Sequence, residues 1–166
     1  MIIINPGDAP VNFTDPTSGP SSGSVISDFS NFVPSGVYGV WTPANFTSGP
    51  TTFRVVSTDW GGCYFFIDPG INASGATEIK LTVTLNPGNL TDRLIVVLVD
   101  GDGTIRVYSF DNLVGGTHVL TRDLSVFASE DAPGSVPGLD LSNLVQFNIA
   151  GAFHHGRLTA RSWYRG

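Results

Sequence analysis

The chain has 166 residues, which is enough for one domain with a hydrophobic core that needs no disulfide or metal to stabilise it. Only 13% of the residues are charged, the net charge is −6 and the few basic residues are scattered, so a basic nucleic-acid-binding protein is excluded. Glycine (20) and proline (11) are frequent, yet 41% of the residues are hydrophobic. This combination excludes a disordered chain and a helical bundle, and it indicates many short strands joined by turns.

The first 24 residues are predicted to form an extended arm. Residues 5–24 hold 11 Gly, Pro or Ser in 20 positions and cannot form an independent element. An apolar patch precedes them, and the large apolar residues proposed for contacts of the arm are Ile2, Ile3, Ile4, Val11 and Phe13. Residues 25–166 are then expected to form the globular domain. No basic leader precedes the arm and no apolar run is long enough to span a membrane, so neither a secretory signal nor a membrane partner is expected.

Ten strands are predicted in this domain. In 78–85, apolar and polar residues alternate from Ile79 to Leu85, which is typical of a half-buried antiparallel strand. Residues 94–99 are apolar on both faces, and the turn at 100–103 joins them to 104–110 as a hairpin. The other predicted strands are 25–29, 36–41, 51–57, 62–67, 116–121, 144–150 and 157–164, with at most two helical turns over 123–130. Without βαβ alternation, this pattern predicts an all-β fold, a two-sheet antiparallel jelly-roll β-sandwich.

Three segments carry a family resemblance. Val25-Ile-Ser-Asp-Phe29, the hairpin Leu98–Tyr108 and the stretch Leu139–Gly151 resemble the first strand, the central hairpin and the last core strand of galactose-binding-like β-sandwiches. Many carbohydrate-binding modules have this fold, and it is also similar to domains on virus surfaces, including decoration (cement) proteins of tailed-phage heads. The resemblance covers about 25–163. It implies the fold and says little about the ligand, because one fold hosts unrelated tasks.

Three motifs that could carry catalysis or a metal fit a structural role better. Gly19-Pro-Ser-Ser-Gly23 matches the nucleophile-elbow pattern but lies in the Pro-rich arm, without the strand and helix that the elbow needs. Asp100-Gly-Asp-Gly103 could begin a calcium loop, but Thr104 and Ile105 stand where a ligand and a glycine would be required, so a hairpin turn is the better interpretation. His154 and His155 are adjacent, so in a strand they would point to opposite faces. We therefore expect neither enzymatic activity nor a cofactor. Galactose-binding-like modules often hold a structural calcium ion, but no motif in this sequence supports one.

Aromatic residues offer a possible sugar-binding platform, because aromatic rings pack against sugar C–H groups while carboxylates and amides bind hydroxyls. Trp60 in Thr58-Asp-Trp-Gly-Gly62 is the best candidate, since its neighbours favour a loop. The proposed platform is Trp60, Asp59 and Tyr64. The alternative is that Trp60 is a buried core residue.

The C-terminus has an unusual charge pattern. Arg157, Arg161, Trp163 and Arg165 would share one face of a strand, while the first 53 residues contain no Lys or Arg. A positively charged C-terminus and an N-terminal part without positive charge are complementary, which favours a contact between subunits. A solvated edge strand protected by arginine explains the same pattern equally well.

Two functions are weighed on these grounds. The first is a structural protein of a virion, a tailed-phage decoration protein assembled in the host cytoplasm and displayed on the virion surface. It would form a homo-oligomer, possibly a trimer, bind a major capsid or other shell protein, and lay Ile2–Ile4 on the sheet edge of a neighbour. The alternative is an extracellular carbohydrate-binding module of a secreted glycan-active protein, with Trp60 at its glycan site.

Overall fold

The computed structural model describes residues 2–5, 24–27, 34–48, 53–55, 60–85, 92–125 and 138–152. Within these ranges the chain forms eleven strands and one short 3-10 turn, Pro43–Asn45, and no α-helix. The strands are β1 (Ile2–Asn5), β2 (Ser24–Ser27), β3 (Gly36–Gly39), β4 (Phe46–Ser48), β5 (Phe53–Val55), β6 (Gly61–Ile71), β7 (Glu78–Leu85), β8 (Arg93–Asp100), β9 (Ile105–Phe110), β10 (Gly116–Asp123) and β11 (Leu144–Ala152).

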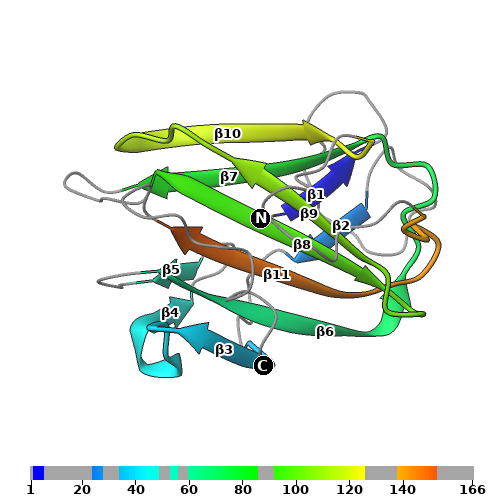
Figure 1. Cartoon of the computed structure of the whole chain (residues 1–166), viewed down its shortest axis with the longest axis horizontal. Coiled ribbons are helices and arrows are strands. Elements are labelled where there is room, and N and C mark those ends of the chain that lie inside the picture. The colour runs from blue at the N-terminus through cyan, green and yellow to red at the C-terminus, as the bar shows by residue number, and fades with distance from the viewer. Residues whose placement is uncertain are drawn as a thin grey trace.

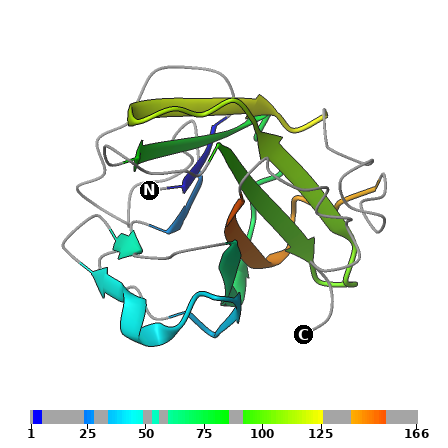
Figure 2. The same ribbon diagram turned by 60° about the vertical axis from the view of Figure 1, so that its left-hand side comes forward.

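The strands form a two-sheet antiparallel sandwich, which confirms the predicted fold class (Figures 1 and 2). One sheet has the order β10-β7-β1-β2 and the other the order β3-β6-β11-β8-β9, while β4 and β5 pair as a small hairpin. The chain passes from one sheet to the other between β6 and β7, β7 and β8, β9 and β10, and β10 and β11. This alternation between sheets is typical of jelly-roll sandwiches, and only the β8–β9 hairpin stays within one large sheet along this part of the chain.

The hydrophobic core lies between the two sheets. From the four-stranded sheet, β7 contributes Ile79, Leu81 and Leu85, which are at most 5% exposed. From the five-stranded sheet, Phe65 on β6 stacks on Phe147 of β11 with 4.5 Å between ring centroids and 11° between the planes. Inward-facing residues of neighbouring strands close this core, namely Cys63, Leu94, Val96, Leu98, Tyr108, Phe110 and Ile149. The predicted alternation in β7 and the two-sided burial of β8 are both observed.

Several predicted strands differ in extent from those observed. The predicted strand 51–57 is the three-residue β5, which pairs with β4, a strand that the sequence analysis did not anticipate. The helical turns expected over 123–130 are not formed in the described part of that segment, because β10 extends to Asp123 and a turn follows at Leu124 and Ser125. The predicted strand 157–164 lies outside the described residues.

The segment Ile2–Ile4 is placed differently from the sequence-based hypothesis, which laid it on a neighbouring subunit. It forms β1, and β1 pairs with β7 on one side and with β2 on the other, in register Ile3↔Lys80 and Ile3↔Val25. Both pairings are within one chain. The backbone groups of this short strand are therefore used by its own domain.

Candidate functional site

The outer face of the five-stranded sheet, turned away from the core, carries aromatic rings on β6, the strand next to the edge strand β3. Side chains alternate along β6, so Phe65 points into the core while Tyr64 and Phe66 point outward. Phe66 is 66% exposed. Its ring meets that of Tyr64 edge to face, with 5.5 Å between centroids and 62° between planes. Phe66 is thus an exposed ring held in place by a second ring.

Two glycines let the tyrosine rings lie close to the backbone of the sheet. In the β3–β6 register, Tyr64 is opposite Gly36 and Tyr38 is opposite Gly62. A Cβ on Gly36 would come within 2.1 Å of the Tyr64 hydroxyl oxygen, and one on Gly62 within 2.5 Å of the Tyr38 ring. Each ring therefore lies over the glycine of the opposite strand, so the rings are held by packing against the sheet.

Two amide side chains lie beside these rings on β11. Asn148 is directly opposite Tyr64, and Gln146 is opposite Phe66. Both are half-buried and face outward, because Phe147 and Ile149 between and beyond them are core residues. Gln146 Nε2 donates a hydrogen bond of 2.8 Å to Asn148 Oδ1, which fixes the orientation of both amides. The face thus combines apolar rings with amide donors and acceptors, the four residues being Tyr64, Phe66, Gln146 and Asn148; we refer to them as the ring–amide surface.

The other half of the same face is apolar and buried. Ile95, Val97 and Val107 are at most 5% exposed and form a second, smaller hydrophobic cluster with Ala150. An ion pair lies at its end, where Arg93 Nε donates to Asp111 Oδ1 at 2.5 Å. Among the described residues of this face, the large apolar side chain that is exposed is Phe66, which belongs to the ring–amide surface.

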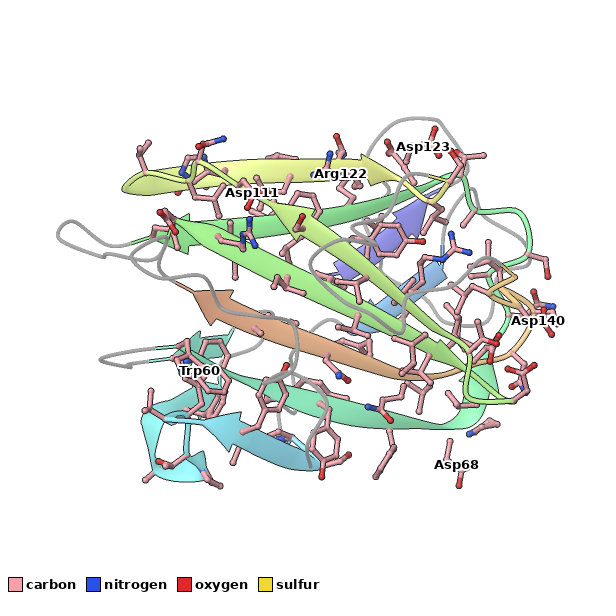
Figure 3. The ribbon with its side chains drawn as sticks, viewed as in Figure 1. Trp60, Asp68, Asp111, Arg122, Asp123 and Asp140 are labelled. Carbon is pink, nitrogen blue, oxygen red and sulfur yellow. The ribbon has the colours of Figure 1, made fainter. Side chains whose placement is uncertain are left out.

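Of the predicted sugar platform, Tyr64 lies in the ring–amide surface and Trp60 lies just before β6, while Asp59 lies outside the described residues. Trp60 is half-buried and packs against the backbone of Gly39, since a Cβ there would come 3.2 Å from Trp60 Cε3. Trp60 lies where the end of β3 pairs with the start of β6 (Figure 3). Trp60 and Tyr64 are four residues apart, about 13 Å along a strand, so the immediate ring partner of Tyr64 is Phe66. Trp41 is buried at 8% exposure and packs against Phe46.

Phe66, Gln146 and Asn148 were missed by the sequence analysis. A signal for the amides was present: in the predicted strand 144–150, polar residues at 146 and 148 alternate with apolar residues at 147 and 149. No comparable signal existed for Phe66, because Phe65 and Phe66 are identical neighbours.

The Asp100–Gly103 segment forms the predicted hairpin turn. Asp100 is 1% exposed, and its carboxylate accepts backbone N–H groups from Asp102, Thr104 and Asp140. These bonds use the carboxylate oxygens to tie the β8–β9 turn to the loop before β11. Within the described ranges no group of three or more metal-ligating acidic, His or Cys residues is present, so the turn holds the loops together without any cluster suited to calcium.

A cleft of about 410 Å³ opens at one end of the sandwich. Arg106 and Tyr108 line it from β9, and Tyr108 donates its hydroxyl proton to the carbonyl of Leu124 at 2.9 Å. Burial raises the pKa of Tyr108 to about 12, with a further upward contribution from Asp123 and an opposing one from Arg106. The remaining lining residues are Ala76, Thr77, Asp123, Leu124, Ser125, Gly138, Leu139 and Leu141. At ordinary pH, Tyr108 is therefore a hydrogen-bond donor that ties β9 to the turn after β10.

The remaining residues singled out by the sequence analysis cannot be placed. Val11, Phe13, Arg157, Arg161, Trp163 and Arg165 lie outside the described residues, as do the Gly19–Gly23 segment, His154 and His155. The arm and subunit-contact predictions at these positions stay predictions. Among the described residues, no helix has the length and apolar character needed to cross a membrane.

Comparisons with known proteins found similarity to solved structures only. No family model matches the chain, and no curated protein matches its sequence. An agarase, AgWH50C, aligns with a TM-score of 0.47 and 9% identity over 76% of this chain and 22% of that one. An exo-beta-agarase aligns with a TM-score of 0.46 and 15% identity over 75% of this chain and 22% of that one. PfGH50B aligns with a TM-score of 0.41 and 17% identity over 57% of this chain and 16% of that one. This chain thus spans about a fifth of the length of these proteins.

Proposed function

We propose that this domain is a carbohydrate-binding module that holds a glycan on the ring–amide surface. The observation that carries the proposal is the row of outward side chains on two adjacent strands, with Tyr64 and Phe66 on β6 opposite Asn148 and Gln146 on β11. This row includes Tyr64, which the sequence analysis had assigned to a sugar platform. The domain is proposed to bind without catalysing a reaction.

The two kinds of side chain match the two sides of a sugar ring. A pyranose presents C–H groups on its faces, which pack against aromatic rings, and hydroxyls around its edge, which exchange hydrogen bonds with amides. Gln146 Nε2 and Asn148 Oδ1 bond to each other, and within the described part of the chain neither Gln146 Oε1 nor Asn148 Nδ2 has another partner. These two groups can therefore accept from and donate to the hydroxyls of a sugar that stacks on Phe66.

Preorganisation supports binding at this surface. Tyr64 is packed over Gly36 and the two amides orient each other, so a ligand would immobilise few side chains. Phe66 is held against Tyr64 while most of its surface stays in water. Covering that exposed ring with a sugar removes apolar area from water, which favours binding.

The hypothesis of a virion decoration protein has less support from the described residues. Its main argument was a clamp made by Ile2–Ile4, and in the structure these residues pair with β7 and β2 of their own chain. Homo-oligomerisation and a shell-protein partner belong to that hypothesis. A mass measurement in solution tests them directly, since a clamped assembly requires a stable oligomer and a binding module does not.

The proposal is tested by removing the exposed ring. We expect Phe66→Ala to weaken glycan binding by about tenfold or more, as loss of a central stacking residue does at other interfaces. Affinity gel electrophoresis against a panel of polysaccharides measures this change. Val119→Ala is the matched control, because Val119 is 61% exposed on the other sheet. If wild-type protein and Phe66→Ala migrate alike in every polysaccharide while both remain folded, the ring–amide surface is not a glycan site.

A further inference from the structure

We infer that the glycan held on the ring–amide surface is a neutral, soluble single chain whose successive sugars turn relative to one another. This inference rests on the proposed function and adds the class of glycan. Two independent features of the surface carry it, namely its charge and the angle between its rings.

Among the described residues, no cationic side chain lies in the ring–amide surface to meet an acidic sugar. Four cationic side chains are described in full, and three of them lie elsewhere: Lys80 on β7 of the other sheet, Arg106 in the cleft, and Arg122, whose guanidinium lies over the Phe110 ring. The fourth, Arg93, is on the same face but at its far end and is bound to Asp111.

The negative net charge of the whole chain also disfavours an acidic glycan. The net charge is −6, so a sulfated or carboxylated polysaccharide is repelled at long range and meets no compensating cation among the described residues of the surface. A site for an acidic glycan would instead place arginine or lysine where Gln146 and Asn148 lie, since charge-assisted bonds to sulfate or carboxylate are the stronger ones. The surface therefore fits a neutral glycan.

The angle between the two rings indicates which shape of ligand can contact both of them. The planes of Tyr64 and Phe66 differ by 62°, so the two rings cannot both lie flat on one planar surface. A crystalline polysaccharide presents such a plane and would contact one ring only. A single chain in solution can meet both rings, if one sugar is rotated relative to the next. The twist of the sheet also turns successive residues of β6 relative to one another, which favours a glycan whose successive sugars turn as well.

The experiment compares polysaccharides that share a backbone and differ in charge or order. Hydroxyethyl cellulose, carboxymethyl cellulose and crystalline cellulose form one such set, and agarose and a sulfated agaran form another; arabinoxylan and galactomannan extend the neutral group. Soluble probes are tested by affinity electrophoresis and crystalline cellulose by pull-down, each with wild-type protein, Phe66→Ala and Val119→Ala.

We expect at least one neutral soluble probe to bind wild-type protein and Val119→Ala alike, and Phe66→Ala about tenfold more weakly. The charged probe of the same set should bind at least about tenfold more weakly than the neutral one, and the neutral affinity should change less than about twofold between about 50 mM and about 500 mM salt. Phe66-dependent binding that prefers the charged or the crystalline probe overturns this inference and leaves the proposed function standing. If no probe binds wild-type protein better than Phe66→Ala, both the proposed function and this inference are wrong.

Discussion

The ring of Tyr38 lies directly over Gly62 of the neighbouring strand, so close that a methyl group on Gly62 would come within 2.5 Å of the ring carbon Cζ and within 2.7 Å of the carbonyl oxygen of Ile149. Glycine is required here because it has no side chain to occupy this space. The close pairing of β3 with β6, the strand that carries both rings of the ring–amide surface, therefore requires a residue without a Cβ at position 62.

Gly62→Ala is therefore expected to destabilise the domain. One of the two contacts is with backbone, which cannot move aside cheaply, so we expect a loss of about 1–3 kcal/mol in the free energy of unfolding, measured by urea denaturation. Gly75→Ala is the control, because Gly75 has nothing within 4 Å of an added Cβ. Equal stability of the two variants would contradict the close packing of Tyr38 on β6.

Asp100→Ala is expected to lower stability more than removal of an exposed aspartate. The variant removes the buried carboxylate that accepts the backbone N–H of Asp140 and one of the two carboxylates that accept the N–H of Thr104, so we expect a loss of about 1–3 kcal/mol by urea denaturation. Asp102→Ala in the same turn is the control, since Asp102 is exposed and its loss should cost less. The role assigned to Asp100 is wrong if the two variants are equally stable.

Acid should weaken the fold through two carboxylates on surface turns. The Ser125 hydroxyl lowers the pKa of Asp123 below its usual 3.8, and the Ser142 hydroxyl does the same for Asp140, each with help from a backbone N–H. A carboxyl with a lowered folded-state pKa stabilises the fold fully well above pH 3.8, and this stabilisation is lost as the pH falls through 3.8 toward the folded-state value. Urea midpoints should therefore fall as the pH is lowered across this range.

A double variant that lacks both serine hydroxyls is the control for this measurement. The double variant Ser125→Ala, Ser142→Ala removes the main hydrogen bond to each carboxylate, so its urea midpoint should depend less on pH over this range than that of wild-type protein. An unchanged acid dependence in the double variant would show that these turns do not cause it.

Cys63 is expected to be unreactive in the folded protein. Its side chain is fully buried, and burial raises the pKa of the thiol to about 12 against a smaller opposing effect of the Ile149 backbone. The thiolate, which is the reactive form, is thus both rare and inaccessible at pH 8. Thiol-reagent labelling should be complete in guanidinium chloride and negligible in buffer; rapid labelling of the folded protein would contradict the placement of Cys63 in the core.

The elements predicted most accurately are those specified by local pattern. The strand 78–85 was predicted with its observed bounds, because Ile79, Leu81 and Leu85 alternate with polar residues. The β8–β9 hairpin was also predicted, since turn residues at 100–103 follow a continuous apolar run. In both cases the information lies within a few residues.

The position of β1 could not be predicted in this way. Ile2–Asn5 pairs with residues about 75 positions further along the chain, and a short apolar strand offers the same backbone groups to any sheet edge, in its own chain or in a neighbour. Only the assembled sandwich distinguishes these partners. In the structure, β1 fills the place between β7 and β2.

By itself the sequence determined that this chain forms many short strands with alternating burial. It did not determine which side of β6 would face the core. Phe65 and Phe66 make this plain, because these identical neighbours are 9% and 66% exposed, one stacked in the core and the other in the ring–amide surface. Side chains alternate with a period of two, so a shift of one residue in the packing would exchange their roles. The tertiary structure decided between them by placing the four-stranded sheet against one face of β6 and leaving Phe66 exposed on the other.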